Sequence, residues 1–254
     1  MAEHLLRMKT GNKVGKESVL NLKKELRKLQ NPKQEENLSR FFKTGKGEYG
    51  EGDKFLGIKV PAQRKVAKKY TGLSFGEISR LLKSKIHEER LVGLLILVAQ
   101  YKKSPVEPKE KEKIFRFYLK NTKGINNWDL VDLSAPNIVG GWLFDKPSKR
   151  AILYKLARSK NLWERRIAVL ATAMFIKNSD FNDILKISEI LLNDRHDLIH
   201  KAVGWMLREV GKRDKKILEK FLNKHALKMP RVMLRYSIEK FGERERKIYL
   251  RRMS

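Results

Sequence analysis

The segment LIHKAVGWM, residues 198–206, shares its pattern with two earlier segments, WERRIAVLA (163–171) and HEERLVGLL (87–95). Each segment has a basic residue in fourth place, and apolar residues follow it at helical spacing. Strict apolar and polar alternation, which is typical of strands, is absent from the chain. The three segments therefore predict equivalent helices of a repeated all-α unit.

Two further positions extend this repeat. Trp128 lies in NNWDLVDL and Arg235 in VMLRYSIEKF. A period of roughly 35 to 45 residues with two helices is typical of a HEAT-like helical solenoid, in which the equivalent helix of each unit lines one surface. We therefore expect one domain over residues 1–254. The equivalent positions, separated by 38, 38, 35 and 34 residues, are Arg90, Trp128, Arg166, Lys201 and Arg235.

Composition limits the classes of protein. Hydrophobic residues make up 41% of the chain, enough for a core, and there is no cysteine, which excludes disulfides and thiolate sites. The longest apolar run, residues 91–99, is half the length of a membrane span and predicts a buried helix. The N-terminus lacks a signal peptide, so we expect a soluble, cytoplasmic protein. Residues 43–59 form the one long irregular segment.

The charge of the chain is strongly unbalanced. Lys and Arg total 58 against 29 Asp and Glu, which gives a net charge of +29. Such an excess favours polyanionic partners: DNA, RNA or an acidic membrane surface. No basic helix combines a large apolar face with exposed anchors, so we expect nucleic acid rather than a membrane.

The helix predicted over residues 196–212 divides into two faces. At about 100° per residue, one face is apolar and forms the core side. The opposite face is basic and includes a tryptophan, which favours an interface that stacks or packs on nucleotides. An adjacent helix that covers the tryptophan is the alternative. The residues of this second face are Lys201, Trp205, Arg208 and Lys212.

Four residues from three successive units are expected on one surface. Asp132 follows Trp128 by one helical turn, and it has the offset that Trp205 has in its own unit. The helical neighbours of Arg166 contain no acid, so we expect this arginine to be unpaired and Asp132 to be a lone carboxylate. The alternatives are a core role for Trp128, capping or lysine pairing for Asp132, and a plain surface role for Arg166.

Two aromatics, a carboxylate and an arginine suit the loss of a cationic base from a sugar. Aromatic faces stabilise positive charge, and a carboxylate in a partly dry site stabilises an oxocarbenium-like sugar and orients water. Neither GKGEYG (45–50) nor the pair His196 and His200 supports another site: the first follows a helical pattern, and the second fits a helix start. We expect no metal and no cofactor.

At NNWDLVD, WERRIAVL and HKAVGWMLRE the sequence resembles the AlkD-like DNA alkylation-repair glycosylases. The resemblance covers roughly residues 55–249. It implies a C-shaped HEAT-like solenoid with a basic concave face. It also implies hydrolysis of the N-glycosidic bond of cationic N3- and N7-alkylated purines in duplex DNA, without deep base flipping and without metal or cofactor.

The resemblance also implies residue roles. Trp128 and Trp205 correspond to the pair beside the lesion, Asp132 to the catalytic carboxylate and Arg166 to a phosphate-binding arginine. An N-terminal aromatic also reaches the site in this family, and the sequence leaves three choices. These choices are Phe41, Phe42 and Tyr49. The residues expected to bind DNA are Arg166, Arg208, Lys201, Lys212, Arg90 and Arg235.

Two other functions remain open. The chain could be a non-catalytic protein that binds branched or distorted DNA, or a helical scaffold for other proteins. In the first case Asp132 would be incidental. Because acids are scarce on the predicted surface, we expect steeply salt-dependent binding to undamaged DNA with little sequence preference. We expect alkylated double-stranded DNA to be the preferred partner. We also expect the protein to be a monomer that is associated with the nucleoid when it is bound to DNA.

Overall fold

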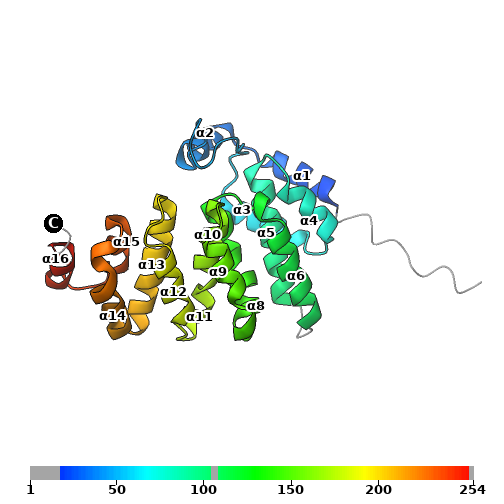
Figure 1. Cartoon of the computed structure of the whole chain (residues 1–254). Helices are drawn as coiled ribbons and strands as arrows, with labels where there is room; N and C mark the ends of the chain where they lie inside the picture. Colours follow the sequence, from blue (N-terminus) through cyan, green and yellow to red (C-terminus); the bar gives the residue numbers. More distant parts are fainter. Residues whose placement is uncertain (1–17, 104–107, 252–254) are drawn as a thin grey trace, which may run out of the picture. The chain divides into compact units, whose positions relative to one another are not determined.

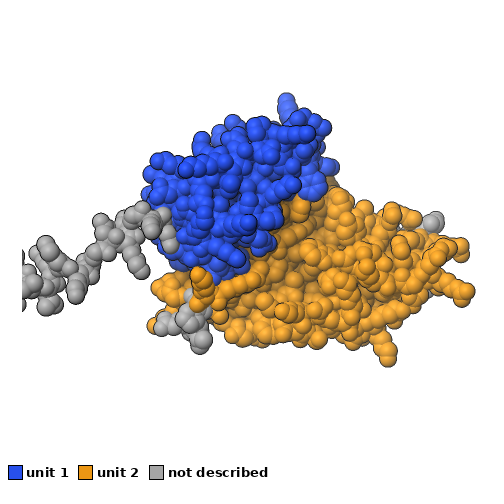
Figure 2. Space-filling view, turned by 180° about the vertical axis from the view of Figure 1, so that it is seen from behind, with its two compact units in different colours: residues 1–100 blue, residues 101–254 orange. Residues whose placement is uncertain are grey.

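The computed structural model describes residues 18–103 and 108–251, and these residues form helices and no strand. The all-α prediction is therefore confirmed. No helix in those residues combines the length and the apolar character needed to cross a bilayer. The chain divides into two compact units, residues 1–100 and 101–254, which Figure 2 colours blue and orange. The single domain over residues 1–254 stays a prediction.

The first unit contains short capped helices and one buried helix. Ser74 and Glu77 cap each other's backbone N–H groups and start α4. Residues 87–98 of α5 are buried without a break, so the apolar run forms the predicted buried helix. The helices are α1 (Val19–Lys28), α2 (Pro32–Phe41), α3 (Val60–Lys69), α4 (Phe75–Leu82) and α5 (His87–Lys103), which runs past the unit boundary.

A buried carboxylate of α5, Glu88, holds the end of the irregular segment 43–59. Glu88 accepts hydrogen bonds from the backbone N–H groups of Leu56, Gly57 and Ile58 at 2.9, 2.9 and 3.1 Å. Gly57 has a φ of 77°, and a Cβ there would meet a backbone oxygen of the preceding loop at 2.1 Å. Only glycine fits this close approach. The segment is irregular, as expected, but tightly fixed.

The second unit is a succession of helices that follow one another along the unit in chain order (Figure 1). A π-helical turn, Pro136–Gly140, joins α7 to α8. Short 3-10 turns at Thr122–Gly124, Pro147–Lys149 and Ala226–Lys228 separate other helices. The helices are α6 (Pro108–Lys120), α7 (Trp128–Ala135), α8 (Gly141–Leu143), α9 (Ala151–Ala157), α10 (Leu162–Ala171), α11 (Ala173–Lys177), α12 (Asn182–Ile190), α13 (Asp197–Arg213), α14 (Lys215–His225), α15 (Arg231–Ser237) and α16 (Glu243–Arg251).

The predicted repeat is confirmed within this unit, because its equivalent helices contact one another in order: α7 with α10, α10 with α13, and α13 with α15. Glycines permit two close approaches. A Cβ on Gly140 would lie 2.3 Å from the Ala171 carbonyl oxygen, and one on Gly204 would lie 2.5 Å from the Met233 carbonyl oxygen. The helix backbones therefore touch at positions where any side chain would separate them.

Helix α13 has the two faces that the sequence predicts. It begins after His196, whose Nδ1 accepts the backbone N–H of Leu198 at 3.1 Å, so this histidine caps the helix. His200 contacts the Asp194 carbonyl with its Nε2 at 2.5 Å. Both histidines thus have the helix-start role that the sequence favoured. The core residues of α13 are all buried: Ile199, Ala202, Val203, Met206 and Val210.

Candidate nucleic-acid interface

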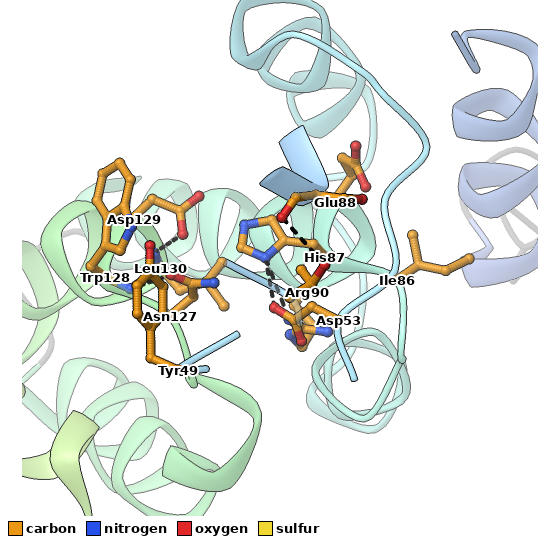
Figure 3. A network of polar contacts seen from close by, with 12 residues as sticks. Tyr49, Asp53, Ile86, His87, Glu88, Arg90, Asn127, Trp128, Asp129 and Leu130 are labelled. Atoms are coloured by element: carbon orange, nitrogen blue, oxygen red, sulfur yellow. Dashed lines mark hydrogen bonds and ion pairs between the residues drawn. The ribbon is translucent and has the colours of Figure 1, made fainter. Parts of the chain in front are cut away.

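Helix α7 sets the first two residues of the site. The side-chain oxygen of the buried Asn127 accepts the backbone N–H of Trp128 at 2.8 Å, and this contact starts the helix. Figure 3 shows Asn127 and Trp128 at this helix start. Asp132 follows one turn later, so both side chains leave the same face of α7, as expected.

Asp132 and Arg166 form a bidentate ion pair. The arginine donates from Nε to Oδ1 at 2.8 Å and from Nη2 to Oδ2 at 2.7 Å. Its Nη1 also donates to the Leu198 carbonyl oxygen at 2.6 Å. One guanidinium therefore links α7, α10 and α13.

This geometry corrects two expectations: Arg166 is not unpaired, and Asp132 is not a lone carboxylate. The helical neighbours of Arg166 lack acids, but its partner is 34 residues away in the sequence, on the preceding repeat helix. The pair is also mostly enclosed, with side-chain exposures of 6% for Arg166 and 18% for Asp132. The two parallel hydrogen bonds fix the orientation of the carboxylate relative to the guanidinium.

The electrostatics of Asp132 follow from this enclosure. Burial raises the pKa of the Asp132 carboxyl above its usual range, while the hydrogen bonds and charge of Arg166 oppose the rise. The nearby charge of Asp129 adds to the increase in the pKa. The carboxylate is thus more basic than an exposed aspartate, which suits a group that must accept a proton from water.

Exposure separates the four tryptophans of the chain into two pairs. Trp142 and Trp163 are buried in the core, whereas Trp128 and Trp205 are only half-buried. Trp205 follows Leu198 by seven residues, so it stands about 10 Å along α13 from the carbonyl that Arg166 binds. The two tryptophans that the sequence selected are therefore the two that remain accessible.

The basic face of α13 carries more acidic compensation than expected. Lys201 pairs with Asp197 at 2.6 Å, and Lys212 pairs with Glu209 at 2.7 Å. Arg208 forms an ion pair with Glu239, which follows α15. Arg235 on α15 is exposed. The cations do lie on the predicted face. The expectation that acids are scarce there was wrong, because acidic partners come from neighbouring turns of α13 and from the segment after α15.

Arg90, in the first unit, is placed differently from the other cations. Its Nη2 lies 2.7 Å from Asp53 Oδ2, and its Nη1 donates to the Ser84 carbonyl oxygen at 2.9 Å. His87 contacts the same Asp53 oxygen at 3.2 Å. Figure 3 shows these side chains pointing toward one another. With 3% of its side chain exposed, Arg90 is a buried structural residue and presents no surface to DNA.

The three N-terminal aromatics also differ in exposure. Phe42 is buried and stacks on Phe55, with ring centroids 5.2 Å apart. Tyr49 is half-buried and donates its hydroxyl to the Phe41 carbonyl oxygen at 3.4 Å. The side chain of Phe41 is 62% exposed, which makes it the aromatic with an accessible ring.

The sequence did not point to Tyr236, one of the exposed aromatics of the described residues. Tyr236 on α15 is 37% exposed and follows Arg235 directly. The repeat gives no signal for it, because the residues that follow the equivalent position in three other repeats, Leu91, Ile167 and Ala202, are all buried.

Comparisons with known proteins agree with this architecture. The family described as DNA alkylation repair enzyme matches residues 22–241. No curated protein matches the sequence. A protein of Enterococcus faecalis described as a predicted DNA alkylation repair enzyme has a similar structure, with a TM-score of 0.65 and 16% identity over 84% of this chain and 97% of that one.

Two solved structures from Streptococcus mutans are also similar. The protein smu.31 of strain UA159 has a TM-score of 0.52 and 14% identity over 89% of this chain and 98% of its own. AlkD2 has a TM-score of 0.52 and 16% identity over 89% of this chain and 97% of its own. At these identities the likeness concerns the fold: the helical repeat is shared.

Proposed function

The chain belongs to the DNA alkylation repair enzyme family, and on that premise we propose that it is a monofunctional DNA glycosylase. Its substrates are cationic N3- and N7-alkylated purines in double-stranded DNA, and the products are the free alkylated base and an abasic site. The observation that carries the proposal is the enclosed Asp132 carboxylate, which lies on the same helix face as the half-buried Trp128. Burial raises the pKa of this carboxyl.

The reaction needs no acid on the leaving group. The C1′–N bond breaks, its electron pair moves to the purine ring, and the positive charge of the base is neutralised. The sugar becomes oxocarbenium-like, and the Asp132 carboxylate stabilises this charge. Water then adds to C1′, and its proton passes to Asp132. The balance leaves a hydroxyl on the sugar and a neutral base.

The remaining residues have supporting roles in this proposal. Trp128 and Trp205 face the cationic base and the sugar, where each cation–π contact contributes about 0.5 to 2 kcal/mol. Arg166 holds Asp132 in orientation. Three of its five N–H groups are used in the contacts with Asp132 and the Leu198 carbonyl, so two remain for a phosphate. Among the three N-terminal aromatics, Phe41 has the most exposed ring, so we propose it as the one that contacts DNA. The phosphates are bound by Lys201, Arg208, Lys212 and Arg235.

The contribution of the pair to binding depends on its charge. Asp132 and Arg166 together are neutral, so the phosphates are attracted by the surrounding lysines and arginines. Binding of undamaged DNA should therefore be salt-dependent, and Asp132→Asn should not weaken it. We propose that the protein acts as a monomer in the cytoplasm, near the nucleoid, without metal or cofactor.

The same ion pair favours one alternative. A carboxylate neutralised by an arginine also fits a non-catalytic protein that binds branched or distorted DNA. The third function, a protein scaffold, would give complexes whose affinity ignores salt. The two DNA functions differ in whether the lesion leaves the DNA, so base release separates them.

The test is release of base from a duplex with a single N7-methylguanine, measured under single-turnover conditions for the wild type and for Asp132→Asn. Release by the wild type alone supports the glycosylase and the role of Asp132. Release by both proteins removes that role. If neither protein releases base while a four-way junction is bound more tightly than a duplex, the non-catalytic function takes its place.

A further inference from the structure

Helix α15 holds an aromatic side chain that the proposed reaction does not use. Tyr236 is 37% exposed. The cations Arg231 and Arg235 are exposed on the same helix. A tyrosine with an apolar ring and a polar tip, set among cations, is typical of an interface with a polar ligand.

The position of Tyr236 is set by a glycine on the neighbouring helix. A Cβ added to Gly204 would lie 2.6 Å from Tyr236 Cβ and 2.5 Å from the Met233 carbonyl oxygen. The tyrosine therefore stands directly over α13 at the residue before Trp205. One turn further on, Arg208 of α13 forms its ion pair with Glu239.

These two contacts run in the same order along both segments. Gly204 precedes Arg208 by one turn of α13, and Tyr236, near the end of α15, precedes Glu239, which lies just after that helix. Tyr236 thus borders the exposed face of α13, beside Trp205 and Arg208. A DNA strand that lies along this face would meet Tyr236 next.

We propose that Tyr236 is a further DNA-contact residue, which packs its ring on the deoxyribose of a nucleotide beside the one that Trp205 contacts. Gly204 is its positioning residue. The inference rests on the proposed function for the identity of the ligand. An aromatic face contributes affinity without neutralising a phosphate, and it tolerates any base.

The test measures the Kd for an undamaged duplex by fluorescence anisotropy at several salt concentrations. Tyr236→Ala should weaken binding about tenfold, with the same salt slope as the wild type. Tyr236→Phe, which keeps the ring, should bind like the wild type. Tyr236→Leu, which keeps apolar volume without a flat ring, should behave like Tyr236→Ala.

A matched control is Phe144→Ala. Phe144 is 36% exposed, follows α8 and stacks on Phe175 of α11. This variant should bind DNA like the wild type. Thermal unfolding of all variants verifies that each is folded at the assay temperature.

Three results would overturn the inference. Binding by Tyr236→Ala and Tyr236→Leu equal to the wild type would remove the contact. Weak binding by Tyr236→Phe would assign the contact to the hydroxyl, and a shallower salt slope in Tyr236→Ala would assign it to a phosphate. Base release is measured separately. If the wild type binds DNA but releases no base, the glycosylase proposal fails, while the binding data still decide whether Tyr236 contacts DNA.

Discussion

Arg90 and Arg166 occupy the same position in their repeats, and each binds a carboxylate at 2.7 Å, yet the two ion pairs differ in surroundings. Asp53 comes from an irregular segment and is 5% exposed. Asp132 comes from the preceding repeat helix, is 18% exposed and follows a half-buried tryptophan by one turn. In these two repeats the arginine is therefore paired with a carboxylate. The access of solvent to the carboxylate decides whether the pair is structural or available for chemistry.

The largest expected effect concerns the accessible pair. Asp132→Asn should lower the rate of N7-methylguanine release by about 100- to 1000-fold, because a preorganised charge beside the sugar is lost. The fold should survive, because the asparagine oxygen still accepts from Arg166. Single-turnover release and a thermal melt measure the two effects. Asp53→Asn serves as the control: its release rate per folded molecule should equal that of the wild type.

The structural pair should dominate stability. Asp53→Ala leaves Arg90 buried without its carboxylate, which should lower the free energy of unfolding by about 3 to 5 kcal/mol. Urea unfolding followed by circular dichroism measures this loss. A loss of unfolding free energy below about 1 kcal/mol would show that Arg90 reaches solvent. Arg90 would then again be a candidate surface cation for DNA binding.

The pH dependence should separate catalysis from stability at Asp132. Since burial raises the pKa of this carboxyl, base release should fall about tenfold per pH unit below the raised pKa, where the carboxylate is lost. Protonation of the same group favours the folded chain. Its stability contribution is complete below the ordinary pKa of 3.8 and is lost as the pH rises through the raised value.

Rate profiles and urea midpoints across acidic pH measure these opposite trends, and Asp132→Asn should remove both. An acid limb in the rate profile that persists in Asp132→Asn would assign it to another group.

The smallest effect concerns the exposed end of the repeat series. Arg235→Ala should reduce the slope of log K against log salt by about 0.9, as expected for one lost phosphate contact. Lys186→Ala, an exposed lysine on α12, is the matched control and should leave the slope unchanged. Equal slopes for both variants would show that the charge of the α15 face acts only through the net charge of the protein.

Short-range periodicity accounts for what the sequence could predict. The faces of α13 and the alignment of Trp128 with Asp132 depend on residues within a few turns of one helix, where the helical period is reliable. The sequence could not pair Arg166 with Asp132, because the partners lie 34 residues apart on different helices.

The burial of Arg90 was hidden for a related reason. Its partner Asp53 lies in residues 43–59, which have no periodicity from which a position could be derived. The exposure of Tyr236 depends on how closely α15 approaches Gly204, and this register is a property of packing. Local pattern therefore gives the face of a helix, while contacts between repeats determine what each face binds.

The triple contact of Arg166 has a consequence for cooperativity. In repeat proteins, stability is approximately a sum of terms within repeats and between nearest neighbours. One guanidinium that holds Asp132 of α7 and the Leu198 carbonyl of α13 adds a link that spans two such interfaces. Local opening of α13 would break the hydrogen bond between Arg166 Nη1 and the Leu198 carbonyl oxygen. The guanidinium that orients Asp132 would then be held less firmly. The orientation of the Asp132 carboxylate is thus coupled to the folding of three consecutive repeats.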